Sequence, residues 1–243
     1  MPRTGSDGCA MPKIFKVMRV VLSGIVLFCA LMAPVFPVQQ PGHEAIKIVD
    51  KPIDFGSERQ KLTLEYRRTH QDPEAQDITI HPQLIILHYT VTPTFTATWN
   101  YFNQVHAEGA REQLAAAGDV NVSAHFVVDR DGTIYRLLPE TWMARHCIGL
   151  NHVAIGVENV GDNDKLKLTP EQVAADAALV RYLAAKYPIT VLLGHHEYRR
   201  MEQTKYFLER DPKYWNTKSD PGDEFMTAVR AKVADLHLGA PPQ

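Results

Sequence analysis

Two histidines and one aspartate have the residue types and positions expected of a catalytic metal site. His88 and His195 each end a short apolar run, and Asp220 lies in the turn-forming segment 218–222, which also carries Lys218. A catalytic zinc ion has three protein ligands and keeps a fourth position open for water. Our hypothesis is that His88, His195 and Asp220 bind Zn2+, and that Lys218 directs a positive charge into the same site. For either histidine taken alone, the alternative is a core residue that only satisfies its own hydrogen bonds.

Glu158 is a carboxylate near the end of the otherwise apolar segment 154–160. Burying a carboxylate in such a strand is costly unless the group is paired or takes part in chemistry. A solvated strand end explains Glu158 equally well from the residues alone, so both interpretations stay open at this point.

The segments that must position these side chains show a mixture of strand and helix patterns. Short apolar or alternating runs predict strands, and helical spacing with capping signals predicts helices. Asp131 and Gly132 form a hairpin signal, and Thr169 to Gln172 is a capping box. The expected strands are 83–88, 124–129, 133–138, 154–160 and 191–195, and the expected helices are 98–105, 110–117, 170–187 and 224–236. The fold class that follows is α/β, with a central mixed β-sheet flanked by helices.

The N-terminal residues 1–36 differ from the rest of the chain. Basic residues precede an apolar run over 20–33, a pattern typical of a signal peptide, or of an N-terminal membrane anchor if it is not cleaved. Residues 37–80 are polar and contain several prolines, so we interpret them as an irregular linker and N-terminal extension. The predicted domain covers 81–237 and is followed by a tail at 238–243. Both interpretations of the leader export the domain to the periplasm or the extracellular space.

Composition excludes some classes of partner. The formal net charge is −2 and charged residues make up 22% of the chain, which gives no electrostatic basis for binding nucleic acid. Removal of the leader would leave Cys147 as the only cysteine, so we expect no intramolecular disulfide. We expect the protein to be a monomer.

Six short segments, in this order, carry a resemblance to a known family. Together they resemble the zinc-dependent N-acetylmuramoyl-L-alanine amidases of the amidase-2 type, a single-domain fold shared with phage zinc lysozymes and peptidoglycan recognition proteins. Each segment alone is weak, and the order of all six makes the match specific over residues 80–236. The segments are 88–90, 122–126, 131–135, 155–159, 194–195 and 218–222.

The resemblance implies a hydrolase that cuts the amide between N-acetylmuramic acid and L-alanine in peptidoglycan or a muropeptide. It places the zinc ligands at His88, His195 and Asp220, the catalytic carboxylate at Glu158 and a cationic stabiliser at Lys218. It also implies three substrate-binding residues, which are His146, Tyr89 and Asn159.

The sequence departs from the family pattern in three places. His195 is followed by a second histidine, His196, and we choose His195 because it directly follows a glycine. Asp220 comes 25 positions after His195, and the insertion between them contains a second Asp-Pro pair at Asp211. Asp211 is a rival third ligand, but it lacks the Lys-x-Asp-Pro-Gly context. Cys147 replaces the small residue expected after His146.

Three other functions can be compared with this one. A thermolysin-like peptidase would need a histidine four residues after His196, where Arg200 stands. A structural zinc site would expect four ligands, usually with cysteines. A non-catalytic peptidoglycan-binding receptor of the same fold is the main alternative. The presence of all three ligands, Glu158 and Lys218 argues against it.

Overall fold

The computed structural model describes residues 46–108, 112–162 and 164–242. The predicted signal peptide or anchor and the first part of the predicted linker lie outside the described residues. Within the described part, no helix is both long enough and apolar enough to span a membrane.

A mixed sheet forms the centre of the fold, as predicted, and it has six strands where five were expected. The strands follow the order β1-β4-β3-β5-β2-β6, and only the β3–β4 hairpin is antiparallel. In the parallel set β5, β2 and β6, the carboxyl ends meet at one edge of the sheet, where loops can gather functional side chains. The strands are β1 (Ile48–Asp50), β2 (Leu84–Tyr89), β3 (Phe126–Val128), β4 (Ile134–Arg136), β5 (Ala154–Asn159) and β6 (Val191–Gly194).

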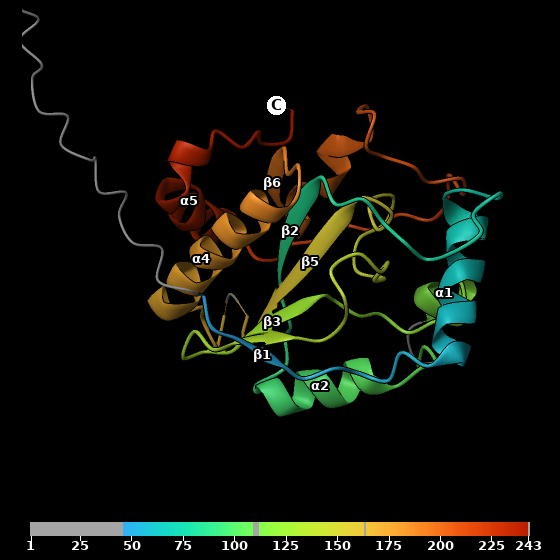
Figure 1. The fold of residues 1–243 in the computed structure, drawn as a ribbon, viewed down its shortest axis with the longest axis horizontal. Coiled ribbons are helices and arrows are strands. Elements are labelled where there is room, and N and C mark those ends of the chain that lie inside the picture. The colour runs from blue at the N-terminus through green and yellow to red at the C-terminus, as the bar shows by residue number, and fades with distance from the viewer. Residues whose placement is uncertain (1–45, 109–111, 163, 243) are drawn as a thin grey trace, which may run out of the picture. The chain divides into compact units, whose positions relative to one another are not determined.

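Helices cover both faces of this sheet. Figure 1 shows α4 and α5 side by side on one side of the strands and α1 on the opposite side of the molecule. The helices are α1 (Ser57–His70), α2 (Phe95–Asn103), α3 (Glu112–Ala116), α4 (Pro170–Lys186) and α5 (Asp223–Lys232), with 3-10 turns η1 (His195–Met201) and η2 (Ala234–Leu236).

Alternation along the strands separates two hydrophobic layers. In β5, Ile155 and Val157 pack with the residues of α4 and α5, whereas Ala154 faces the cluster on the α1 side. Successive side chains of a strand point to opposite faces, so Gly156 and Glu158 share the α1 side with Ala154. The sheet thereby directs Glu158 away from the packed α4–α5 layer.

Local signals in the sequence explain how two of these elements form. The capping box of α4 is present, since the Thr169 hydroxyl accepts from Gln172 N and the Gln172 side chain accepts from Thr169 N. In the β3–β4 hairpin, Gly132 has φ of 84°, a conformation that glycine adopts without steric cost. Both predicted features are confirmed.

The interpretation of residues 37–80 as irregular is wrong for the described part of that segment. Residues 48–50 pair with β4, and α1 is a helix of 14 residues. The amino-acid pattern did not indicate this helix because most of the side chains that α1 buries are polar and do not form an apolar stripe. Arg59, for example, is fully buried and donates to the carbonyl groups of Asp54 and Phe102. These residues therefore belong to the same folded unit as the sheet.

The insertion between His195 and Asp220 is held against α1 by a hydrogen bond between two buried side chains. His70 Nδ1 lies 2.8 Å from Glu209 Oε1, and His70 Nε2 lies 2.7 Å from the carbonyl oxygen of Ala117. Arg210 N also donates to the carbonyl of His70. The insertion is thus tied to the body of the domain before it returns to the sheet edge at Asp220.

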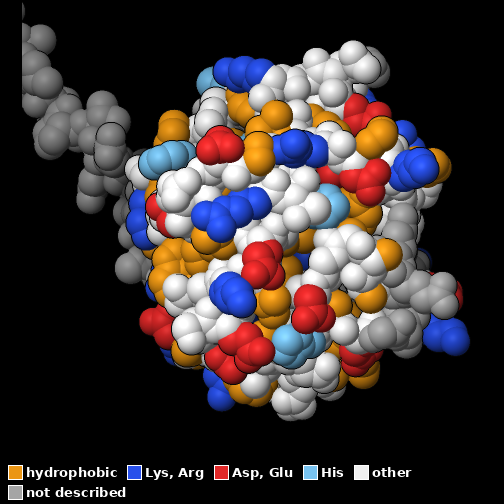
Figure 2. Space-filling model, turned by 90° about the vertical axis from the view of Figure 1, so that its right-hand side faces the viewer, with side chains coloured by type: hydrophobic (Ala, Val, Ile, Leu, Met, Phe, Trp, Pro, Cys, Tyr) orange, Lys and Arg blue, Asp and Glu red, His pale blue; other side chains and the backbone are white. Residues whose placement is uncertain are grey.

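The surface on the α1 side carries charges of both signs. Figure 2 shows acidic, basic and hydrophobic side chains intermixed on this face, without a continuous basic region among the coloured side chains. This distribution agrees with the formal net charge of −2 and gives no support to nucleic-acid binding on this face.

Candidate metal centre and active-site cavity

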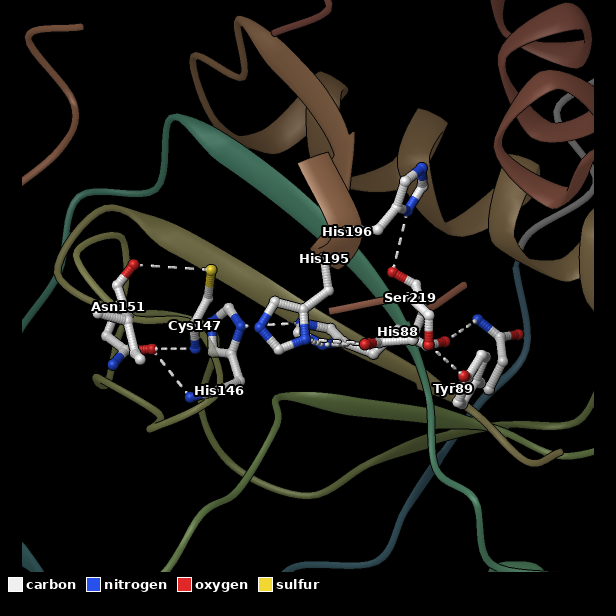
Figure 3. Close-up of polar contacts among 11 residues, drawn as sticks. His88, Tyr89, His146, Cys147, Asn151, His195, His196 and Ser219 are labelled. Atoms are coloured by element: carbon white, nitrogen blue, oxygen red, sulfur yellow. Dashed lines mark hydrogen bonds and ion pairs between the residues drawn. The ribbon is translucent and has the colours of Figure 1, made fainter. Parts of the chain in front are cut away.

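The structure brings His88, His195 and Asp220 together at the carboxyl edge of the sheet. His88 Nδ1 lies 2.9 Å from His195 Nδ1 and 3.2 Å from Asp220 Oδ2, and His195 Nδ1 lies 2.9 Å from the same oxygen. His88 is in β2, His195 begins η1 directly after β6, and Asp220 comes from the end of the insertion. The centroids of the His88 and His195 rings are 4.3 Å apart, and the two rings overlap in the view of Figure 3.

This donor set fits a zinc ion. Tetrahedral zinc with nitrogen and oxygen ligands at about 2.0–2.1 Å separates neighbouring donor atoms by about 3.3 Å, close to the distances between these three atoms. At most one proton fits between the two Nδ1 atoms, and Asp220 Oδ2 faces both rings. A cation at the centre satisfies all three lone pairs at once.

Protonation also favours metal binding at this cluster. Burial, together with the neighbouring His88, lowers the pKa of His195 to about 4, so this imidazole is neutral at pH 7. Burial alone would raise the pKa of Asp220, but His195 and His88 outweigh burial and hold that pKa well below its usual range. Neutral imidazole and ionised carboxylate are the forms that bind zinc.

His196 and Asp211, the two rivals, lie outside this cluster. His196 Nε2 pairs with Asp223 Oδ1 at 2.9 Å, and its backbone N–H donates to the carbonyl of Asp220. Figure 3 shows its ring set apart from the ring of His195. Asp211 is exposed and accepts a hydrogen bond from Lys213 N. The backbone contact of His196 instead helps to fix the position of Asp220.

The backbone at His195 is positioned by Glu197, the residue that directly follows His196. Glu197 is buried, accepts a hydrogen bond from Gly194 N at 2.8 Å and pairs with Arg230 at 2.6 Å. These contacts fix the start of η1, where His195 lies. Glu197 therefore has a structural role, in line with the failure of the thermolysin-like motif.

A cavity of about 510 Å³ opens beside the three proposed ligands. Glu158 lies on its wall and is paired in register with His88 across β5 and β2. Lys218 also lines the cavity, and its charge contributes to the low pKa of His195. Tyr89 lines it too, with its hydroxyl 2.8 Å from Ser219 Oγ. The cavity thus combines a carboxylate, an ammonium group and the proposed metal ligands.

Asn159 is not at this cavity, so its prediction as a substrate-binding residue is corrected. Asn159 is fully buried, and its Nδ2 donates to Asp176 Oδ2 at 2.9 Å and to the carbonyl of His88 at 3.3 Å. Asn159 follows Glu158 in the strand, so the two side chains point to opposite faces of the sheet. Asn159 supports the backbone of His88 from the α4 side.

Sequence reasoning missed several residues that support the site. Asp176 is buried on α4, and burial raises its pKa to about 7. Asp176 comes three residues after Val173, on the apolar face of the expected helix, and this position could have indicated that its carboxyl group is buried. Asn151 accepts hydrogen bonds from the backbone N–H groups of His146 and Cys147, but nothing in its local sequence indicated this role.

Arg145 is a second residue that the sequence did not identify. It is buried, and its guanidinium donates to the carbonyl groups of Leu114, Gly118 and Val120 and to the hydroxyl of Tyr214. Arg145 thereby joins the cavity wall to the segment around α3 and to the insertion. A lone arginine beside His146 carried no sequence signal for this role.

Comparison with known proteins places the chain in a family. The family model described as N-acetylmuramoyl-L-alanine amidase, Amidase_2, matches residues 78–223, more than half of the chain. The chain belongs to this family. The match spans β2 to the first residue of α5 and includes all three proposed ligands, Glu158 and Lys218.

Two phage endolysins are similar to this chain in sequence. The endolysin of Escherichia phage T7 is 40% identical over 85 residues, which covers 33% of this chain and 56% of the endolysin. The endolysin of Enterobacteria phage T3 is 39% identical over the same length. The chain therefore matches only about half the length of these relatives.

A solved structure extends the likeness over most of the fold. The endolysin N-acetylmuramoyl-L-alanine amidase LysCS from Clostridium intestinale URNW aligns with a TM-score of 0.52 and 26% identity, covering 79% of this chain and 99% of LysCS. The predicted α/β architecture of a single amidase-2 domain is confirmed.

Proposed function

We propose that this protein is a zinc-dependent N-acetylmuramoyl-L-alanine amidase that hydrolyses the bond between N-acetylmuramic acid and L-alanine in peptidoglycan. The observation that carries the proposal is the convergence of His88 Nδ1, His195 Nδ1 and Asp220 Oδ2 within 3.2 Å of one another at the edge of a cavity. Family membership and the printed names of the relatives support the same activity.

The chemistry requires an activated water, a polarised carbonyl and a proton for the leaving nitrogen. His88, His195 and Asp220 would hold the zinc ion, which would supply the Lewis acidity that polarises a carbonyl and lowers the pKa of a bound water to about 7. Glu158 takes the proton from the attacking water and delivers it to the alanine nitrogen. Water is thereby added across the amide, which yields the muramic acid carboxylate and a free L-alanyl peptide.

Lys218 stabilises the negative charge that develops on the carbonyl oxygen as the carbon becomes tetrahedral. Its ammonium group belongs to the same segment as Asp220, and both residues line the cavity. Removal of one donor from an oxyanion site typically costs about 2.7–4 kcal/mol of transition-state stabilisation. Loss of Lys218 should therefore lower kcat. Tyr89, which lines the cavity, is our candidate for a substrate contact.

Export and oligomeric state follow as part of the proposal. An enzyme that cuts peptidoglycan must reach the cell wall, which agrees with the predicted signal peptide or anchor over residues 1–36. An uncleaved leader would attach the domain to the membrane. We propose that the domain acts there as a monomer, since its proposed ligands and catalytic groups all come from one chain.

A non-catalytic receptor of the same fold would need the cavity but not the catalytic groups. Glu158 and Lys218 both line the cavity, beside a complete set of metal ligands. A receptor that only binds peptidoglycan does not need a carboxylate and an ammonium group beside a complete set of metal ligands, whereas amide hydrolysis uses all of these groups. This combination favours the enzyme.

Product analysis of digested cell wall tests the proposed activity. We expect the zinc-loaded protein to release from purified peptidoglycan free stem peptides that begin with L-alanine, and to leave glycan strands without peptides. Mass spectrometry of both fractions identifies the bond that is cut. Disaccharide-peptides would indicate a glycosidase, and shortened peptides still attached to glycan would indicate a peptidase. Unchanged peptidoglycan that retains bound protein would support the receptor.

A further inference from the structure

His146 lines the cavity, but both of its ring nitrogens already have partners in the protein. His146 Nδ1 lies 3.1 Å from His88 Nε2, and His146 Nε2 lies 3.3 Å from the carbonyl oxygen of Ala154. A carbonyl oxygen can only accept a hydrogen bond, so Nε2 of His146 carries a proton. In the neutral ring, Nδ1 is then an acceptor.

This tautomer of His146 determines the tautomer of His88. An acceptor at His146 Nδ1 requires His88 Nε2 to donate, so the proton of His88 is on Nε2. The lone pair of His88 then lies on Nδ1, the atom that faces His195 and Asp220. A chain of two hydrogen bonds thereby connects the carbonyl of Ala154 to the metal-facing atom of His88.

Three groups of contacts hold His146 in place. The backbone N–H of His146 donates to Asn151 Oδ1 at 2.8 Å, and the same oxygen accepts from Cys147 N at 2.7 Å. The ring meets His88 edge-on, with centroids 5.2 Å apart and an interplanar angle of 83°. Figure 3 shows His146 between Asn151 and the ring of His88.

The third contact is with β5, where Gly156 provides the space for the ring. A Cβ atom at Gly156 would lie 2.7 Å from Cγ of His146, closer than side chains approach one another. Gly156 lies two residues before Glu158, on the same face of the strand. A glycine is therefore needed at position 156 because a larger residue would occupy the space of the His146 ring.

We propose that His146 is a positioning residue that orients His88 as a metal ligand, and not a substrate contact as the family resemblance implied. Histidine ligands of metal ions generally donate their other ring N–H to a fixed partner, and loss of that partner typically costs 10–100-fold in metal affinity. Here the partner is an imidazole whose own orientation is held by Ala154, Asn151 and Gly156. This inference rests on the proposed zinc site but not on the identity of the substrate.

Two variants with opposite hydrogen-bonding capacity test this role. His146→Leu replaces the imidazole with an apolar side chain of similar bulk and removes the acceptor for His88 Nε2. His146→Asn keeps an oxygen near the position of Nδ1. Zinc affinity is measured by competition with a chelator, without substrate, on variants whose folding is checked by circular dichroism. We expect His146→Leu to bind zinc about 10–100-fold more weakly, and His146→Asn to recover most of the loss.

Two further readouts separate positioning from substrate binding. At saturating zinc, the KM of His146→Leu for a muramoyl-peptide should stay within about two-fold of wild type. In the zinc-loaded wild-type protein, 15N NMR should show that His88 and His146 are both protonated on Nε2. This measurement does not depend on the folding of any variant.

The outcomes separate this inference from the proposed function. Unchanged zinc affinity in His146→Leu with a raised KM, or a His146 protonated on Nδ1, would return His146 to the substrate and overturn the inference alone. A wild-type protein that binds no zinc would overturn both the inference and the zinc-dependent function. Zinc binding that weakens in His146→Leu, in a protein that does not cleave peptidoglycan, would overturn only the function.

Discussion

Glu158→Gln is expected to bind zinc like the wild-type protein and to lose about 10²- to 10⁴-fold in turnover, the usual contribution of a general acid–base group. Glu158 lies on the cavity wall, in register with His88 on the neighbouring strand, but it is not one of the three converging donor atoms. Glutamine has nearly the same shape and cannot take a proton from water. The measurement combines kcat on a defined muramoyl-L-alanyl peptide with the zinc content of the purified variant.

A surface carboxylate provides the matched control for this prediction. Glu202 pairs with Arg199 at the end of η1 and is not among the residues that line the cavity. Glu202→Gln should leave both kcat and zinc content unchanged. If Glu158→Gln stays within a few-fold of wild type, Glu158 is only a polar strand end and the proposed proton transfer is wrong. If it loses zinc, its role is in the metal site.

His88→Ala, His195→Ala and Asp220→Ala are each expected to weaken zinc binding by more than about 100-fold and to abolish measurable turnover. The expectation follows from the small number of ligands, because a site with three protein ligands has none to spare. The loss of zinc affinity in these variants should exceed the 10–100-fold loss that is typical when a residue that only supports a ligand is removed. Chelator competition and metal analysis of each variant measure the effect.

His196→Ala and Asp211→Ala are the matched controls for the ligand variants. His196 pairs with Asp223, and Asp211 caps a turn at Lys213, so neither side chain points to the three donor atoms. Both variants should retain zinc. Loss of the metal in His196→Ala but not in His195→Ala would exchange the two histidines. Loss in Asp211→Ala but not in Asp220→Ala would move the third ligand into the insertion.

The sheet and the three converging side chains could be predicted because their signals are local. His88 ends the apolar run that becomes β2, and His195 directly follows the apolar run that becomes β6. Because β2 and β6 are parallel, their carboxyl ends lie at one edge of the sheet. Asp220 could be preferred over Asp211 from its Lys-x-Asp-Pro-Gly context alone. The structure confirms that these three side chains meet, which spacing in the sequence could not demonstrate.

The elements that the sequence did not reveal depend on polar contacts between distant segments. Helix α1 has no apolar stripe because it buries Arg59 and His70. Arg59 donates to the carbonyl of Phe102 and His70 contacts the carbonyl of Ala117, and both of these partners lie more than 40 residues away along the chain. The family resemblance implies that Asn159, which follows Glu158 in the chain, binds substrate. Strand alternation places the two on opposite faces, and the contact with Asp176 becomes visible only once α4 is packed on the sheet.

Titration of the metal-free protein with zinc, followed by release of free amine from a defined N-acetylmuramoyl-L-alanyl peptide, tests the central claim most directly. The account predicts no amide hydrolysis without metal and a rise in activity that saturates at one zinc per chain. It also predicts a single new amino group, on the L-alanine. Full activity after exhaustive removal of the metal, or cleavage at another bond of the peptide, would contradict the proposal that His88, His195 and Asp220 form the zinc centre of an amidase.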